Sequence, residues 1–263
     1  VDKQIHIFNK NDFSYLTSIG NFGEGPEEIT VMGCLAIDEA HHQLYVSDHA
    51  KQKIFSYDMD SVMVDSLYKP QVKTAMNETL FPSEYQYIND TLSIAVLIKP
   101  TSTSTFNQFL GRWNMNTGEM IPMKYTHPDI QKKRITFAAS EKAGIYVECY
   151  TRHDLMTICS LDGELLYNIY GPDWDGGNGN KLQSFGTVMI GNDKIFVSYC
   201  GEDYARDSFP TKILVFDLEG NYLKTLETGY KISDCCYDSF NNRIILSLND
   251  VVQFAYLDID GII

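Results

Sequence analysis

Short runs of alternating hydrophobic and polar residues recur along the whole chain, and each ends at an Asp or Asn followed by a turn. Alternation with a period of two is typical of half-buried β-strands. Asp, Asn and Gly suit the turns because they tolerate a positive φ and bond to their own backbone. The pattern therefore predicts a repeated β-hairpin. It occurs six times. The first strand of each copy, with its Asp or Asn, covers residues 5–9, 54–58, 110–114, 158–163, 214–217 and 254–258.

A second predicted hairpin precedes five of these six copies. In residues 35–47 and 236–247 the separation from Asp to Ser is the same, because Asp38 and Ser47 are nine positions apart and so are Asp238 and Ser247. These two hairpins should share their length and register. The remaining copies lie at residues 87–97, 137–147 and 188–197. Each full unit is therefore expected to hold four antiparallel strands.

The unit length points to one architecture. From Asn9 to Asp258 there are five steps, and (258 − 9)/5 gives about 50 residues per unit. Four-stranded units of about 40–50 residues in series are typical of a β-propeller. No segment of useful length follows a helical period. We therefore expect an all-β fold, a single β-propeller domain over residues 1–263. A β-sandwich or two stacked β domains is the alternative.

The number of blades follows from the first residues. Five complete units follow an orphan pair of strands in residues 1–20. Six blades, the first of them incomplete at the N-terminus, are favoured, because closing a ring of five needs one extra strand and not two. Five blades remain the alternative.

One segment after the first hairpin is distinctive. Residues 19–29 read IGNFGEGPEEI, which resembles the IG-x-x-G-x-GP-x-E-[FI] segment of the six-bladed, TolB-like propeller proteins of Bacteroidetes, relatives of the NHL-repeat propellers. The resemblance implies an exported, often lipid-anchored protein of the periplasm or cell envelope, and it offers no family catalytic residues to carry over to this chain. Taken by itself, the segment indicates a tight crossover between blades, with flexible glycines and a rigid Pro26. A role in ligand binding is the alternative.

Composition narrows the classes of partner. The chain has 21 Lys and Arg against 35 Asp and Glu, which gives a net charge of −14. Nucleic acids and anionic membranes repel such a chain, so neither is expected as a partner. No apolar run approaches the roughly 20 residues of a transmembrane helix. The chain begins at Val1 without Met, and we expect a removed segment upstream, with a lipid anchor as one form of it.

The six cysteines lack the spacing of a metal or redox site, because no two of them form a C-x-x-C pair. Most lie in apolar runs, where free Cys behaves as a small core residue. We expect buried thiols, with at least one disulfide as the alternative. Cys235 and Cys236 should point to opposite faces of a strand.

No catalytic motif is present: the chain lacks a G-x-S-x-G elbow, an H-E-x-x-H pair and a Walker loop. We therefore expect a non-enzymatic binding propeller of the cell envelope whose partner is a glycan, a peptide or an envelope protein. The alternative is a metal-dependent hydrolase or lyase with a divalent ion in the channel. Its candidate ligands, near the predicted inner strands, are Asp38, Asn89, Glu148 and Asp238.

Loops on one face of a propeller are expected to carry the binding residues, since loops on a rigid scaffold often carry function. Aromatic rings there can stack on a sugar, and charged groups can bond hydroxyls or a peptide. Ordinary solvation of polar loops is the alternative. The candidates are Asp48, His49, Arg152, His153, Asp173, Trp174, Glu202, Asp203, Tyr204 and Arg206, the last four in a predicted loop over residues 200–211.

A Gly-rich acidic segment, residues 173–180, is a candidate calcium site. Asp173, Asp175 and Asn178 offer oxygen ligands on a flexible loop, which suits Ca²⁺. The segment lacks the terminal Glu of an EF-hand. An ordinary polar loop is the alternative, because Gly and Asn are also common loop residues.

Overall fold

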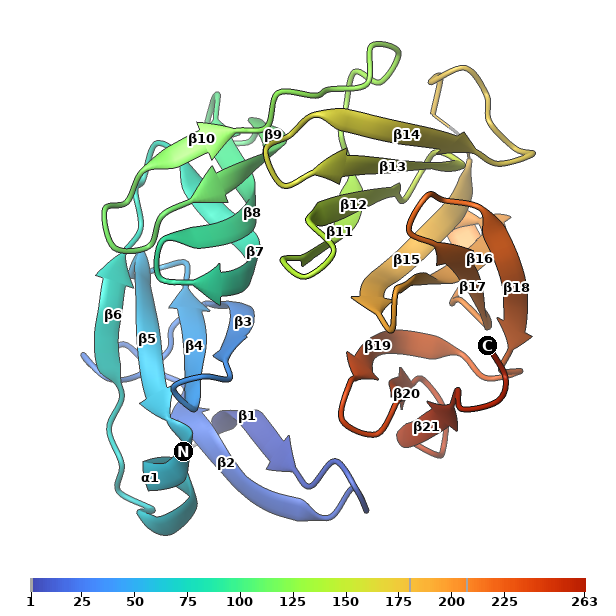
Figure 1. Cartoon of the computed structure of the whole chain (residues 1–263). Coiled ribbons are helices and arrows are strands. Elements are labelled where there is room, and N and C mark those ends of the chain that lie inside the picture. Colours follow the sequence, from blue (N-terminus) through green and yellow to red (C-terminus); the bar gives the residue numbers. More distant parts are fainter. Residues whose placement is uncertain (1, 180, 207) are drawn as a thin grey trace. The chain divides into compact units, whose positions relative to one another are not determined.

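The computed structural model describes residues 2–179, 181–206 and 208–263, and in these residues the strands form six antiparallel sheets (Figure 1). Four of the sheets have four strands each. The six sheets are the blades of an all-β propeller, as the repeat predicts. By its contacts the chain divides into two compact units, residues 1–122 and 123–263, and each is described by itself. The single domain over residues 1–263 stays a prediction.

Residues 1–122 hold the first three sheets. The first has only two strands, β1 (Lys3–Phe8) and β2 (Tyr15–Asn21). The second has β3 (Met32–Asp38), β4 (Gln43–Asp48), β5 (Lys53–Asp58) and β6 (Gln71–Ala75). The third has β7 (Phe81–Asn89), β8 (Leu92–Pro100), β9 (Phe106–Trp113) and β10 (Met120–Pro122). The prediction of an incomplete first blade is thus confirmed.

Residues 123–263 hold the other three sheets. The fourth has β11 (Ile135–Ser140), β12 (Ile145–Tyr150), β13 (Leu155–Ser160) and β14 (Leu165–Tyr170). The fifth has β15 (Leu182–Gly191), β16 (Lys194–Asp203), β17 (Lys212–Asp217) and β18 (Tyr222–Glu227). The sixth has three strands in the described residues, β19 (Ile232–Asp238), β20 (Arg243–Leu248) and β21 (Phe254–Asp258). Four of the five units that the sequence predicted as complete therefore have four strands in the described residues, and the last has three.

The predicted common register of two hairpins is confirmed. Asp38 of β3 pairs with Gln43 of β4, and Asp238 of β19 pairs with Arg243 of β20, across the same separation in both. Both aspartates are buried. Asp38 accepts a hydrogen bond from the backbone N–H of His41 at 3.2 Å, and Asp238 accepts one from the guanidinium of Arg243 at 3.0 Å. The recurring Asp is therefore a structural residue of the turn.

Two short helices depart from the sequence prediction. Helix α1 (Met59–Val64) follows β5, and its N-cap Asp58 accepts a hydrogen bond from Ser61 N at 2.7 Å. A 3-10 helix, η1 (Tyr204–Arg206), follows β16. Because β16 continues to Asp203, the predicted loop over residues 200–211 is shorter than expected. No described helix has the length and hydrophobicity that crossing a membrane requires.

The hydrophobic core lies where neighbouring sheets of one unit face each other. Ile5 and Ile19 of the first sheet pack with Leu44 and Phe55 of the second. Equivalent clusters join the second sheet to the third, the fourth to the fifth, and the fifth to the sixth. All six cysteines are free, and four of them are buried. Cys235 is buried and Cys236 exposed, as alternation in β19 predicts.

Candidate functional site

An aromatic cluster forms around Trp174, in the loop between β14 and β15. Its indole lies 5.0 Å from the Tyr170 ring and 5.4 Å from the His127 ring, measured between centroids. The His153 ring, from the turn between β12 and β13, lies 6.0 Å away. His127 and Tyr170 also share a hydrogen bond of 3.0 Å. Three segments distant in the sequence are thus held together by ring contacts.

The Trp174 loop is attached to the turn between β12 and β13 through Asp154. The Asp154 carboxylate is buried and accepts a hydrogen bond from Asp173 N at 3.0 Å, and Gly171 N donates to the Asp154 carbonyl at 2.8 Å. Burial raises the pKa of Asp154. A Cβ atom at Gly171 would lie 2.0 Å from Asp154 Oδ2, so this position requires glycine. The predicted site residue Asp173 acts here through its backbone.

His153 is the most deeply buried of the predicted binding residues in residues 123–263 whose side chains the structure describes. Its side chain is 7% exposed, and its Nδ1 has no hydrogen-bond partner among the described residues. The nearest carboxylate oxygen, Asp175 Oδ1, is 3.8 Å away, beyond hydrogen-bond range. Burial lowers the pKa of His153 although Asp175 opposes this shift. The imidazole is therefore neutral at neutral pH.

The candidate calcium loop is held by its own hydrogen bonds. Asp175 Oδ1 accepts from Gly177 N at 3.2 Å, and the Asn178 amide donates to the Asp175 carbonyl at 2.8 Å. No group of three or more His, Cys, Asp and Glu side chains suited to a metal ion occurs in the described residues. Calcium binding by Asp173, Asp175 and Asn178 stays a prediction, and the function proposed below does not depend on it.

A cavity of about 670 Å³ lies beside this loop, and we refer to it as the basic cavity. Three of its residues carry a positive charge (Lys132, Arg134 and Arg152), whereas Asp129 is its one acidic residue. Uncharged hydrogen-bonding side chains and glycines complete it. Its lining comprises Asp129, Gln131, Lys132, Arg134, Thr151, Arg152, His153, Gly176, Gly177, Asn178 and Gly179.

Glycine gives the basic cavity one of its walls. Gly177 has a φ of +85°, and a Cβ atom there would lie 2.4 Å from the Asp129 carbonyl oxygen. Any side chain would therefore strain the backbone and push Asp129 away. The close approach of these two segments joins the loop after β14 to the segment before β11.

Of the residues lining this cavity, Arg152 and His153 were predicted as binding residues and Asn178 as a calcium ligand, whereas Lys132 and Arg134 were not predicted. The signal was the run of three basic residues at 132–134 in an acidic chain. Its middle member, Lys133, is buried and bonds to Glu148, while its two neighbours line the basic cavity. A single run therefore serves both the core and the candidate site.

The predicted residues of the β16–β17 connection do not line the basic cavity. Glu202 and Asp203 belong to the ladder between β15 and β16, where they pair with Gln183 and Leu182. Glu202 accepts a hydrogen bond from Ser208, and Asp203 caps the η1 turn through Ala205 N at 3.0 Å. Arg206 is exposed. The side chain of Tyr204 lies outside the described residues.

Asp48 and His49 lie in residues 1–122, and Asp48 has a structural role there. Its fully buried carboxylate accepts hydrogen bonds of 2.8–3.2 Å from four backbone N–H groups, those of Thr30, Val31, Ala50 and Lys51. Burial by itself raises the pKa of Asp48, but these donors outweigh it and the pKa is lowered. A carboxylate so fully engaged holds the loop after β4 to the loop before β3.

His49 is enclosed beside Asp48. A Cβ atom at Gly33 would lie 2.3 Å from His49 Nε2, and the Phe81 ring is 6.0 Å away. The buried Nε2 has no hydrogen-bond partner among the described residues, and burial lowers the pKa of His49. The contacts give His49 a packing role.

The glycine-rich segment before β3 is built around Glu28. Its Oε2 accepts a hydrogen bond from Gly25 N at 2.8 Å, and a Cβ atom at Gly23 would lie 2.0 Å from the same oxygen. Lys51 donates to the carbonyls of Gly25 and Glu28 at 2.6 and 2.5 Å. These bonds support the crossover interpretation of residues 19–29.

The side chains proposed for a channel metal are engaged with protein partners. Glu148 forms an ion pair of 2.5 Å with Lys133. Asn89 accepts from Thr91 N at 3.0 Å in a turn. Asp38 and Asp238 serve the hairpin turns described above. None of these contacts points to a metal centre, and the enzyme alternative gains no support from them.

The DUF5128 family model, described as a 6-bladed β-propeller, matches residues 1–148. No curated protein matches the sequence.

Solved structures share the fold at low identity. A DUF4221 family member from Bacteroides vulgatus gives a TM-score of 0.63 at 9% identity, over 96% of this chain and 86% of that chain. A protein of unknown function from Bacteroides caccae gives 0.55 at 12%, over 98% and 87%. The extracellular domain of a putative one-component system from B. thetaiotaomicron gives 0.58 at 13%, over 95% and 31%. At such identities the similarity concerns the fold alone.

Proposed function

The chain belongs to the DUF5128 family of six-bladed β-propellers, and we propose that it is a non-enzymatic binding module of the cell envelope whose basic cavity holds a carboxylate-bearing glycan. One observation carries this proposal. Lys132, Arg134 and Arg152 surround a cavity of about 670 Å³ in a chain whose net charge is −14. A concentration of positive charge against the overall sign favours an anionic ligand.

The cavity chemistry fits a carboxylate. Arg offers a planar pair of N–H donors that matches the two oxygens of a carboxylate, and Lys adds a point charge. The volume lies within the range of about 300–1,000 Å³ typical of ligand pockets. It exceeds the space that one carboxylate fills, so the ligand extends beyond its acidic group.

The uncharged lining favours a sugar over a simple acid. Gln131, Thr151 and Asn178 offer amide and hydroxyl groups that bond to sugar hydroxyls. The Gly176–Gly177 backbone presents no side chain on its wall, which leaves room for a bulky ring. A uronic acid combines a carboxylate with several hydroxyls and matches both parts of this lining.

The proposed location of the protein in the cell envelope is supported by its structural neighbours and not by the cavity. One structural neighbour is the extracellular domain of a Bacteroides protein, and two others come from Bacteroides species. The net charge of −14 is compatible with a soluble exported chain. Export and lipid anchoring are part of the proposal.

Isothermal titration with trigalacturonate, maltotriose and hexaglutamate tests the ligand. We expect heat with trigalacturonate that Arg152→Gln reduces, whereas any heat with neutral maltotriose should be the same in that variant as in wild type. Arg152→Gln and Lys132→Gln should each weaken binding about ten- to a hundredfold, since each loses a charge-assisted hydrogen bond. Lys142→Gln, an exposed lysine outside the basic cavity, is the matched control and should bind as wild type.

Two outcomes would overturn the proposal. Heat with hexaglutamate alone would replace the glycan by an acidic peptide. An equal affinity in Arg152→Gln and wild type would place the ligand outside the basic cavity.

A further inference from the structure

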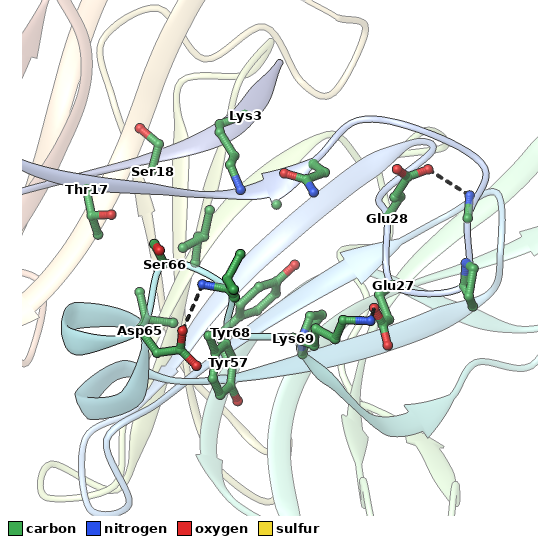
Figure 2. Close-up of a pocket in the computed structure, with 18 of the residues that line it drawn as sticks. Lys3, Thr17, Ser18, Glu27, Glu28, Tyr57, Asp65, Ser66, Tyr68 and Lys69 are labelled. Carbon is green, nitrogen blue, oxygen red and sulfur yellow. Dashed lines mark hydrogen bonds and ion pairs between the residues drawn. The ribbon is translucent and has the colours of Figure 1, made fainter. Parts of the chain in front are cut away.

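A second cavity, in residues 1–122, lies between the first sheet and the segment that follows β5 (Figure 2). We propose that it binds an uncharged saccharide. The cavity shares no residue with the basic cavity, so the inference does not depend on the proposed function. We refer to it as the β2 cavity.

The β2 cavity is enclosed by three segments. Figure 2 shows Thr17 and Ser18 of β2 on one side, with the Lys3 side chain extending from β1 toward the segment that carries Ser66 and Tyr68. The loop containing Glu27 and Glu28 closes one end of it. Its volume of about 600 Å³ is within the range typical of ligand pockets and suits a disaccharide.

Two buried polar atoms in its lining have no hydrogen-bond partner among the described residues. They are the Tyr57 hydroxyl oxygen, in a residue only 2% exposed, and Asn21 Oδ1. Buried polar groups in folded proteins are almost always paired, and an unpaired one is costly. A ligand that accepts from Tyr57 and donates to Asn21 would satisfy both. Sugar hydroxyls can both accept and donate hydrogen bonds, so a saccharide carries both kinds of group.

The Tyr57 phenol is suited to donate. Burial raises its pKa to about 12, so it keeps its proton throughout the neutral range. Its ring packs 6.3 Å from the Tyr68 ring, whose own hydroxyl accepts from Asp58 N at 2.9 Å. The Tyr68 hydroxyl thus has a protein partner, whereas that of Tyr57 has none among the described residues.

The charges of the lining nearly cancel. Glu27 forms an ion pair of 2.8 Å with Lys69, and Glu28 is bonded to Gly25 N. Lys3 and Asp65 add one charge of each sign. Such a lining selects neither an anion nor a cation, and it contrasts with the basic cavity.

Apolar surface lies among these polar groups. Ile19 and Val62 line the β2 cavity, and Leu67, which is 81% exposed, adds apolar surface to it. The exposed ring of Tyr15 also belongs to the lining. Sugars present an apolar C–H face beside their hydroxyls, and aromatic and aliphatic groups pack against that face. The combination favours a saccharide over a small inorganic ion.

Titration with cellobiose, maltose and lactose, followed by protein-observed NMR, tests this inference. We expect at least one of them to bind at millimolar concentration and to shift resonances of Thr17, Ser18 and Ser66. Tyr57→Phe removes only the hydroxyl and should weaken binding about tenfold. Tyr85→Phe is the matched control, because its hydroxyl is also buried with no hydrogen-bond partner in the described part of the chain but lies outside the cavity. It should bind as wild type.

Lys3→Ala is a second variant, and it changes an exposed residue of the lining. It should weaken binding severalfold. It provides a test of the site even if Tyr57→Phe fails to fold. Arg152→Gln should leave the affinity for the neutral sugar unchanged, which separates this site from the basic cavity. The inference is overturned if none of the three disaccharides binds, or if Tyr57→Phe and Lys3→Ala both bind as tightly as wild type.

Discussion

The Lys133 ammonium lies 2.5 Å from the Glu148 carboxylate, and their side chains are 8% and 1% exposed. The Tyr150 hydroxyl donates to the second carboxylate oxygen at 3.2 Å. Lys133 stands between Lys132 and Arg134, which line the basic cavity. The ion pair therefore attaches the segment that carries the candidate site to β12.

Glu148→Gln should lower the free energy of unfolding by about 3–5 kcal/mol, because it leaves the Lys133 charge buried without its partner. Urea unfolding followed by circular dichroism measures this loss. The double variant Lys133→Met with Glu148→Leu should recover most of it, since no buried charge remains. Lys142→Gln, 84% exposed, is the control. A Glu148→Gln protein as stable as wild type would show that the pair contributes nothing.

Asp48→Asn should destabilise the protein by about 1–3 kcal/mol at pH 7, because an amide cannot replace a carboxylate that accepts four N–H bonds. The lowered pKa of Asp48 in the folded state fixes the sign of the pH effect. Its contribution is present above the unfolded value, near 3.8, and is lost as the pH falls through the folded value.

Unfolding free energies of wild type and Asp48→Asn, measured from pH 6 to pH 2, should therefore converge at the acidic end. Asp193→Asn, at an exposed aspartate, should follow wild type at every pH. A constant gap between wild type and Asp48→Asn would contradict the assignment.

Gly171→Ala should destabilise the protein by about 1–3 kcal/mol, since the new Cβ would lie 2.0 Å from the Asp154 carboxylate. The Trp174 emission spectrum should shift as well, because the loop carrying Trp174 begins at this contact. The companion variant Gly118→Ala meets no atom within 4 Å. At a φ of +76° it carries only backbone strain, so it should leave the Trp174 spectrum unchanged.

Acidification below about pH 6.5 should destabilise residues 123–263 through His127 and His153. Burial lowers the pKa of both, so the unfolded chain takes up protons first as the pH falls. Asp129 and Asp175 oppose these shifts without reversing them. The slope of unfolding free energy against pH between 7 and 5 should flatten in His153→Gln. His6→Gln, at an exposed histidine, should keep the wild-type slope.

Strand pairing was predictable because it follows local rules. The equal separation of Asp38 from Ser47 and of Asp238 from Ser247 predicted one register for two hairpins, and the structure has it. A two-residue alternation determines which side chains share a face, so Cys235 and Cys236 were also placed correctly. Helix α1 was missed because six residues are too few to show a helical period, and its clearest signal is the cap at Asp58.

The candidate site was only partly predictable. Arg152 and His153 could be assigned to a loop, and the basic run at residues 132–134 is visible in the sequence, but only the tertiary structure places Lys132 and Arg134 at the same cavity. Asp48 looked like a binding residue because an isolated loop carboxylate gives no indication of the N–H groups around it. The unpaired Tyr57 hydroxyl had no sequence signature.

The sequence by itself determined the all-β fold, the four-strand repeat and the incomplete first blade, because hydrophobic alternation and turn residues act between near neighbours in the chain. Only the tertiary structure decided which charged and polar groups are buried, paired or left open to a ligand. Those outcomes depend on atoms brought together from separate loops, such as Gly177 with Asp129 and Lys133 with Glu148. Desolvation and hydrogen bonding at these contacts set the charge state and role of each side chain.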